Sequence, residues 1–268
     1  MDDPELEDAV RRITGRHDRP RHELVRFAFL RLLGLVYAFA FLGATQQLPA
    51  LVGPRGLLPA QSYLDRAASY YGSPAAAFLE RPTIFVATGA SDAALLAVSY
   101  LGLALSLATL AGVTNALVMA LLFSIQLSIV HVGQTFYGYG WEILLCEAGF
   151  LAIFICPLGT LRPLPASETP HLLVWLLRWL SFRVMFGAGL IKLRGDSCWD
   201  DLTCLAFHYE TQPLPNPLSW ALHHAPPWLG TLGVIANHLV ELIVPFFLFG
   251  PRLVRYAGGG SSSRSSSR

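Results

Sequence analysis

The stretch RWLSFRVMFGAGLIKLRGDSCWDDLTCLAFHYETQPLPNP, residues 178–217, sets the fold class of this chain. Its first half reads as an apolar helix that nevertheless carries Arg178, Arg183 and Lys192. From Gly195 onward it becomes a loop rich in cysteine, aromatic and charged residues. Ionisable side chains at membrane depth are costly, so each needs a partner or a function. The stretch therefore predicts a membrane span that leads into an ordered loop.

The composition of the whole chain also indicates a membrane protein. Of 268 residues, 53% are hydrophobic and 14% are charged, and the mean hydropathy is +0.48, which is unusual for a soluble domain of this length. The formal net charge of +1 argues against nucleic acid as a partner. Lys192 is the only lysine among 19 basic residues. Its presence is either chance or a need for lysine chemistry that arginine does not supply.

Hydropathy predicts six membrane spans, because about 20 apolar residues cross a bilayer. They cover residues 24–44, 93–111, 114–131, 141–158, 171–193 and 228–249. Only Gly112 and Val113 join the second and third spans, which predicts a tight antiparallel hairpin, and Pro157 ends the fourth. We therefore expect an all-α, polytopic membrane bundle of about six transmembrane helices.

Arginine placement predicts the orientation, since basic residues concentrate on the cytoplasmic side. Five arginines lie in the first 22 residues, and Arg252 and Arg255 follow the last span, so both ends are expected in the cytoplasm. The loops on the far side are then 45–92, 132–140 and 194–227. The expected organisation is a polar cytoplasmic tail at 1–22, a multi-pass domain at 23–250 and a disordered Gly/Ser/Arg tail at 251–268.

Cys198 and Cys204 lie in the predicted far-side loop 194–227. On an oxidising side of the membrane they can form a disulfide that closes this loop. Free thiols and a redox-active pair are the alternatives, although the spacing is not CxxC. A zinc site with His208 matches no zinc-ligand spacing. The sequence has no P-loop, dinucleotide fingerprint, GxSxG or HExxH motif, so we predict no metal and no cofactor.

A set of ionisable side chains lies within the predicted spans. Its members are Glu142, Glu147, Arg178, Arg183, Lys192, His238 and Glu241. One interpretation pairs the three glutamates with the three bases inside the bundle. The other is a catalytic or ligand-binding cavity lined by Lys192, His238 and Glu241. Gly187 and Gly189 are expected to permit a close approach between helices.

The far-side loop ends in FHYETQPLPNP, residues 207–217, which combines aromatic residues with closely spaced prolines. Such a segment is preorganised and presents a defined surface beside the membrane. The surface either recognises a partner or packs on the mouth of the bundle. The candidate partner-binding residues are Arg194, Asp196, Trp199, Asp200, His208, Tyr209 and Glu210.

Four blocks of the chain resemble the lipase maturation factor family. They are GPRGLLP at 53–59, VGQTFYGYGWEILLCEAGFLAIFICPL at 132–158, FRVMFGAGLIKLRGDSCWDDLTCLAFHYETQPLPNP at 182–217 and NHLVELIVPFFLF at 237–249. They follow the family order, and the third block is highly specific. The resemblance implies a multi-pass protein of the endoplasmic reticulum membrane that assists the folding and assembly of secreted lipases. In a bacterial source, the cytoplasmic membrane would take its place.

Two other functions are kept as alternatives. The family is distantly similar to the membrane portion of vitamin K-dependent carboxylases, which implies an intramembrane enzyme with Lys192 or His238 as base and Glu241 as orienter. A thiol-redox role for Cys198 and Cys204 is the third option. We favour a non-enzymatic maturation factor whose partners are client lipases and the lipid bilayer. Family members continue well beyond residue 268, so we expect this chain to be a fragment.

Overall fold

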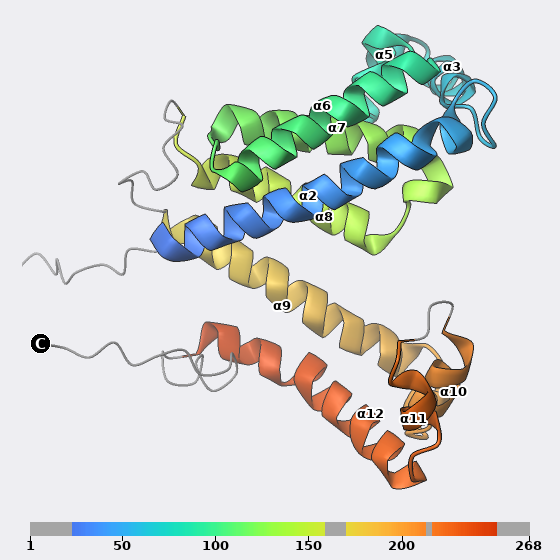
Figure 1. Cartoon of the computed structure of the whole chain (residues 1–268), viewed down its shortest axis with the longest axis vertical. Helices are drawn as coiled ribbons and strands as arrows, with labels where there is room; N and C mark the ends of the chain where they lie inside the picture. Colours follow the sequence, from blue (N-terminus) through green and yellow to red (C-terminus); the bar gives the residue numbers. More distant parts are fainter. Residues whose placement is uncertain (1–22, 159–169, 213–215, 251–268) are drawn as a thin grey trace, which may run out of the picture. The chain divides into compact units, whose positions relative to one another are not determined.

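The computed structural model describes residues 23–158, 170–212 and 216–250. Across these ranges every regular element is a helix, which confirms the predicted all-α class (Figure 1). The chain divides into two compact units, Met1–Val174 and Trp175–Arg268. The predicted cytoplasmic tail 1–22, the basic residues Arg252 and Arg255 and the tail 251–268 lie outside the described residues.

The chain is a multi-pass membrane protein. Within the described ranges, five helical segments are long and apolar enough to cross a bilayer: Leu24–Val52, Asp92–Ala111, Ala116–Tyr137, His171–Arg194 and Pro227–Phe249. The remaining predicted span forms helix α8 (Gly140–Ile155), whose 16 residues give a length of about 24 Å. The chain then continues without helical structure, and the Pro157 carbonyl accepts a hydrogen bond from Ala116 N–H at the start of helix α7. The segment 140–157 therefore runs the length of α7.

Helix α2 (Glu23–Val52), with 30 residues, is the longest helix of the first unit. Apolar residues cover all of its faces, as is typical of a membrane helix. The exposed face includes Leu32 and Phe39. The buried face repeats at intervals of three or four residues and consists of Leu30, Leu33, Tyr37, Phe41, Ala44, Leu48 and Val52.

Small residues bring helix α6 (Asp92–Ala111) close to α2. A Cβ atom at Gly102 would lie 2.8 Å from the ring of Phe41, so glycine is required at this contact. The buried hydroxyls of Ser99 and Ser106 donate to carbonyls of their own helix, at 2.8 and 2.7 Å. Close packing by small residues and internally satisfied hydroxyls suits association inside a bilayer.

The predicted hairpin joins α6 to α7 (Ala116–Gly133) through residues 112–115. Gly112 has φ +120°, a conformation that favours glycine. The side chain of Asn115 caps α7 by accepting from Val118 N–H at 2.9 Å. After α7, the 3₁₀-helix η1 (Gln134–Tyr137) leads into α8.

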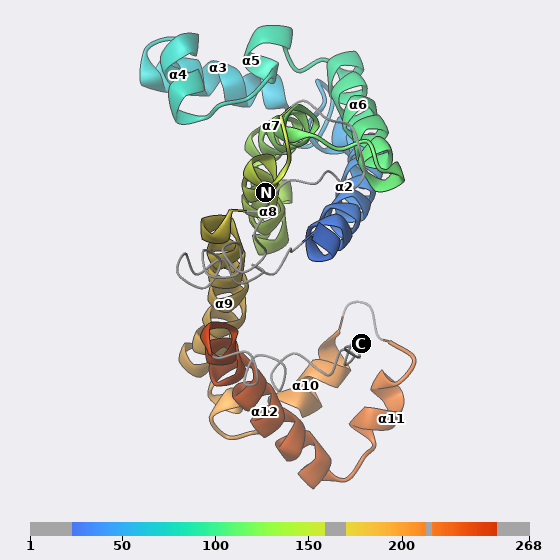
Figure 2. The same ribbon diagram turned by 90° about the vertical axis from the view of Figure 1, so that its left-hand side faces the viewer.

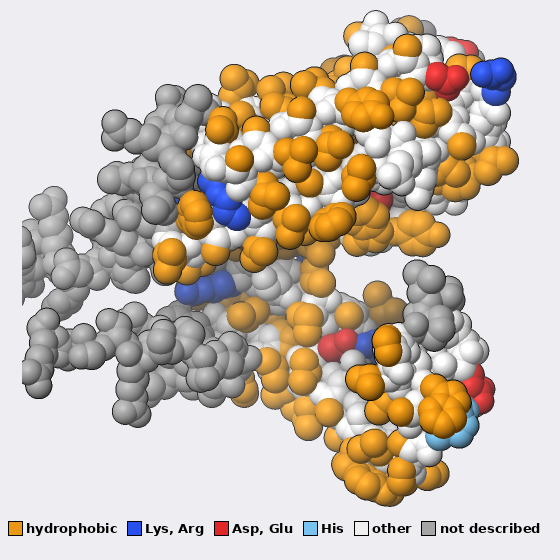
Figure 3. Space-filling view, in the orientation of Figure 1, with side chains coloured by type: hydrophobic (Ala, Val, Ile, Leu, Met, Phe, Trp, Pro, Cys, Tyr) orange, Lys and Arg blue, Asp and Glu red, His pale blue; other side chains and the backbone are white. Residues whose placement is uncertain are grey.

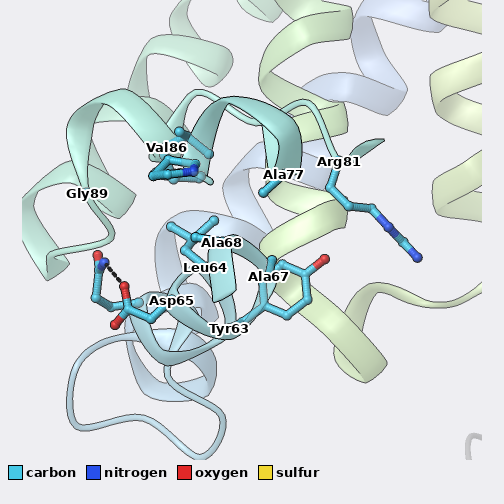
Figure 4. Close-up of a pocket in the computed structure, with 12 residues that line it drawn as sticks. Tyr63, Leu64, Asp65, Ala67, Ala68, Ala77, Arg81, Val86 and Gly89 are labelled. Atoms are coloured by element: carbon cyan, nitrogen blue, oxygen red, sulfur yellow. Dashed lines mark hydrogen bonds between the residues drawn. The ribbon is translucent and has the colours of Figure 1, made fainter. Parts of the chain in front are cut away.

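The segment between α2 and α6, predicted as a loop, folds into three short helices. These are α3 (Ala60–Tyr71), α4 (Pro74–Glu80) and α5 (Phe85–Thr88). Two polar contacts fix the segment to α7: Ile84 N–H donates to Ser128 Oγ at 2.9 Å, and His131 Nδ1 lies 2.9 Å from the Pro82 carbonyl. Side chains of the three helices surround a cavity of about 120 Å³ (Figure 4).

The second unit contains two spans with a folded connection between them (Figure 2). Helix α9 (His171–Arg194) leads through η2 (Ser197–Trp199), α10 (Cys204–Thr211) and α11 (Ser219–His223) to α12 (Pro227–Leu242). Helix α12 continues as η3 (Val244–Phe249), because Pro245 has no N–H with which to extend the α-helical ladder. The rings of Phe182, Phe246 and Phe249 pack together, with centroids 5.1 to 5.4 Å apart.

Candidate functional site

The second unit holds a folded cap, defined here as η2, α10 and α11 with their described connections, residues 197–212 and 216–223. A disulfide between Cys198 and Cys204 closes its first turn, as one of the predicted alternatives required. The Thr203 N–H donates to the Cys198 carbonyl at 2.9 Å, across the same turn. Leu202, inside the turn, has φ +59°, an uncommon conformation for a residue with a side chain. The covalent bond and the backbone bond together stabilise this tight turn.

A polar cluster connects α9 to α12 beneath the cap. The Nζ of Lys192 lies 2.5 Å from Glu241 Oε1 and 3.1 Å from Asn237 Oδ1. Asn237 in turn donates to Glu241 Oε2 at 3.3 Å. The Lys192 and Glu241 side chains are 23% and 13% exposed, so water screens their attraction only in part. The cluster is therefore an ion pair completed by an amide.

Trp199 links this cluster to the cap. Its ring lies under the Lys192 ammonium, with 4.9 Å between Nζ and the ring centroid, a cation–π geometry. His238 Nε2 is 3.3 Å from the Trp199 carbonyl, and the two rings are 5.9 Å apart. The carbonyl can only accept, so Nε2 carries a proton; the other ring nitrogen is Nδ1. Within the described residues, this Nδ1 is buried without a hydrogen-bond partner.

The glycines of α9 have different surroundings. A Cβ at Gly189 would lie 2.6 Å from Leu242 Cδ2 and 3.1 Å from Glu241 Cβ, so this glycine permits the approach of α12. A Cβ at Gly187 would meet nothing within 4 Å. The predicted close approach therefore occurs at Gly189 alone, one turn before the Lys192–Glu241 pair.

Helices α10 and α11 form the outer part of the cap. Gly233 of α12 makes room for Leu205 of α10, whose Cδ1 would lie 2.5 Å from an added Cβ. The Ser219 hydroxyl accepts from Gln212 Nε2 at 3.3 Å and from Asn216 N–H at 3.1 Å. These bonds tie Gln212 and Asn216 to Ser219; residues 213–215 between them lie outside the described ranges.

The outer surface of the cap is apolar and aromatic with charged neighbours. Trp220 is 73% exposed, and Phe207 and Leu218 are also exposed. Glu210 Oε1 lies 3.4 Å from His223 Nε2, and His224 follows in sequence. Figure 3 shows histidine, acidic and hydrophobic side chains close together on this part of the molecule. A surface of this kind suits contact with another protein.

The predicted loop residues fall into two groups. Arg194, Asp200, His208 and Glu210 are exposed, and Tyr209 is half-buried with its ring 5.8 Å from that of His208. Asp196 is exposed as well, and its Oδ1 accepts from Cys198 N–H at 3.0 Å, whereas Trp199 is half-buried. Asn237 was missed, although it precedes Glu241 by one helical turn. Phe207 and Trp220 were not predicted, because the sequence does not show whether an apolar side chain is exposed.

The predicted intramembrane charges belong to both units. Lys192, His238 and Glu241 lie together, whereas Glu142 accepts from the Gln126 amide at 2.7 Å rather than from a base. Glu142 and Glu147 belong to the first unit, and Arg178 and Arg183 belong to the second. The Arg178 guanidinium lies over the Trp175 ring at 5.4 Å. Pairing of all three acids with the three bases was therefore wrong for Glu142.

Among the described residues, no group of three or more histidine, cysteine, aspartate or glutamate side chains is placed to hold a metal ion. The Lys192 ammonium is engaged by a carboxylate, an amide and a ring. These contacts hold α9, α12 and the cap together.

Comparison with known proteins places the chain in a family. The family model described as "Lipase maturation factor transmembrane domain" matches residues 24–263. The chain is 47% identical to lipase maturation factor 1 of Bos taurus over 232 residues, which are 84% of this chain and 41% of that protein. Its identity to lipase maturation factor 1 of Homo sapiens is 46% over 233 residues, with the same two coverages.

Lipase maturation factor 2 of Rattus norvegicus is 38% identical over 240 residues, which are 83% of this chain and 34% of that protein. The chain thus spans about two fifths of the first relatives and about one third of the last. No solved structure matches the chain. The match of one family model to nearly the whole described region, with relatives up to 47% identical, is decisive: the chain belongs to the lipase maturation factor family.

Proposed function

We propose that this chain is a membrane-embedded part of a maturation factor of the endoplasmic reticulum, and that its cap contacts secreted lipases while they fold and assemble. The names of its relatives supply the client class. The observation that carries the proposal is the cap itself. It exposes Phe207, Leu218 and Trp220 on a surface whose backbone is fixed by a disulfide and by contacts to α12.

Rigidity and exposure together favour a binding role for the cap. Ordering a flexible loop on binding costs free energy for each side chain and backbone unit that becomes fixed. A cap that is already ordered avoids most of that cost. Exposed aromatic residues with polar neighbours are frequent at the centres of protein–protein contacts. The two spans of the second unit then serve to hold the cap at the membrane surface.

The same geometry speaks against the alternative functions. Lys192 donates to both Glu241 and Asn237, which suits a structural contact better than a base that must accept a proton. The Cys198–Cys204 disulfide closes a turn that also contains a backbone hydrogen bond, which suits a structural crosslink. The relatives are named as maturation factors and not as enzymes.

The test is secreted lipase activity in cells that lack their own maturation factor. Expression of this chain should restore activity, and the double variant Tyr209→Ala/Glu210→Ala should lose most of it while remaining inserted in the membrane. Phe207→Ala/Trp220→Ala should act in the same direction. The matched control is Tyr70→Ala, an aromatic residue of the first unit that is 82% exposed.

Two outcomes would count against the proposal. One is unchanged lipase activity in both cap variants at equal protein abundance. The other is an equal loss in the Tyr70→Ala control, which would point to a general effect of exposed aromatic residues. Absence of rescue by the parent chain, when a longer relative rescues in parallel, would assign client binding to sequence beyond these 268 residues.

A further inference from the structure

The first unit contains a hollow of about 460 Å³ that the proposed function does not use. It lies between α2, η1 and the first turn of α8, and we name it the α2–α8 hollow. Its volume falls in the range of small-molecule sites, about 300–1,000 Å³. One wall is the apolar side of α2, with Val36, Phe39, Ala40 and Gly43.

The opposite wall combines aromatic rings with one carboxylate. Phe136, Tyr137, Tyr139 and Trp141 line the hollow together with Glu142, and no lysine, arginine or histidine does. Glu142 is only 3% exposed. The Gln126 amide donates to its Oε2 at 2.7 Å and holds the side chain in place, but it supplies no positive charge. A buried carboxylate without a basic neighbour costs free energy to ionise, and a cation bound beside it lowers that cost.

Aromatic faces around a carboxylate form a site for a cation that is itself partly apolar. A quaternary ammonium group fits this description, because it is attracted to the faces of tryptophan and tyrosine and needs no hydrogen bonds. Only Gln47, Tyr137, Tyr139 and Glu142 among the lining residues carry side-chain oxygens, fewer than the roughly 6–8 ligands that a calcium ion takes.

The position of the hollow indicates where the cation comes from. Tyr139 and Trp141 are exposed, Trp141 by 51%, at the end of a membrane helix, where such residues occupy the bilayer interface. From there the wall formed by Ala40, Phe39 and Val36 continues along α2 into the apolar part of the span. A molecule that fills the hollow therefore has a cationic group at the interface and a hydrocarbon chain below it.

We propose that the α2–α8 hollow binds a choline-headed phospholipid of the bilayer, with the trimethylammonium group beside Glu142 and the aromatic rings and an acyl chain along α2. The bound lipid compensates the Glu142 charge and covers the small residues Ala40 and Gly43. This site lies wholly within the first unit and is independent of the client-binding cap.

Native mass spectrometry of the purified chain tests the proposal, with phosphatidylcholine and phosphatidylglycerol of identical acyl chains added after delipidation. The chain should retain phosphatidylcholine about tenfold more tightly, a difference of about 1.4 kcal/mol. Glu142→Gln should abolish this preference, whereas Glu147→Gln, which changes an acid of the same helix outside the hollow, should keep it. Equal retention of the two lipids by the parent chain would overturn the proposal.

A second measurement covers the case in which Glu142→Gln does not fold. Trp141→Ala removes an exposed ring and should reduce phosphatidylcholine retention severalfold, whereas Phe150→Ala, an exposed ring of α8 outside the hollow, should not. A photoreactive phenylalanine analogue in place of Tyr139 should crosslink to lipid in membranes. Crosslinks to polypeptide alone would assign the hollow to helix packing and overturn the proposal.

Discussion

The three candidate spans of the first unit bury 28 to 50% of their most apolar windows, whereas each of the two spans of the second unit buries 11%. The first unit relies on close packing of small residues, as at Gly102 against Phe41. The second relies on discrete links: a disulfide, the Lys192–Glu241 pair and edge-to-face aromatic rings. One family domain therefore contains a densely packed region and a region held by a few specific contacts.

Overpacking the first unit should produce the largest effect. Gly149→Val places a Cβ 1.9 Å from Tyr37 Oη, and Tyr37 cannot move aside because it is fully buried and stacked on Phe41. We expect a loss of about 3 kcal/mol in the free energy of unfolding, measured by thermal unfolding in detergent. Gly140→Val in the same helix is the control, since a Cβ there meets nothing within 4 Å. Equal destabilisation by both variants would refute the packing argument.

Removal of the disulfide should destabilise the cap and leave the first unit intact. Closure of a seven-residue turn is worth about 2 kcal/mol in the chain-entropy treatment. The variant Cys198→Ser/Cys204→Ser should therefore show faster amide hydrogen exchange across residues 197–211 and unchanged exchange in α2 and α6. Reductant added to the parent chain should have the same effect. Equally fast exchange in both units would mean that the two are not separately stabilised.

The Lys192–Glu241 pair should show coupling between its members. Lys192→Met or Glu241→Leu alone should cost about 1–2 kcal/mol, because each leaves a partly buried charge without its partner. The double variant should recover part of that loss, which a double-mutant cycle in thermal unfolding measures. Arg194→Met, an exposed base of the same helix, is the control. Strictly additive losses would mean that the pair contributes no coupling.

A glycine substitution in the second unit should give the smallest effect. Gly189→Val meets Leu242 and the Glu241 Cβ, but α12 is weakly buried and can shift away. We expect a loss of about 1 kcal/mol, and less for Gly187→Val, whose Cβ meets nothing. Thermal unfolding of both variants, compared with Gly149→Val, measures the difference in packing between the units. A larger loss at Gly189 than at Gly149 would reverse the comparison.

Five of the six predicted spans correspond to candidate spans of the described residues, because about 20 apolar residues in a row are conspicuous in sequence; the fourth forms α8, which has 16 residues. The hairpin at Gly112 followed from the short connection alone. The helical fold of residues 60–88 was not predictable in this way, because contacts such as Ser128 with Ile84 join residues 44 positions apart. The same limit applies to Gln126, which is sixteen residues from Glu142 and becomes its partner only in the folded helix pair.

Residues of the candidate site were predicted unevenly for a related reason. Cysteines and charged residues in apolar sequence are conspicuous, so Cys198, Cys204, Lys192 and Glu241 were found. Sequence does not reveal which apolar residues face outward, so the exposed Phe207 and Trp220 were not predicted. Trp199 was predicted as a partner-binding residue, but its contact with Lys192, 4.9 Å from Nζ to the ring centroid, could not be predicted from sequence.

The central claim, that the cap of the second unit contacts the client, is tested most directly by site-specific photocrosslinking during lipase synthesis. A photoreactive phenylalanine analogue replaces either Trp220 of the cap or Tyr70 of the first unit, which are exposed by 73% and 82%. If the cap contacts the client, position 220 should crosslink to the lipase and position 70 should give only background. Crosslinks from position 70 but not from position 220 would contradict it.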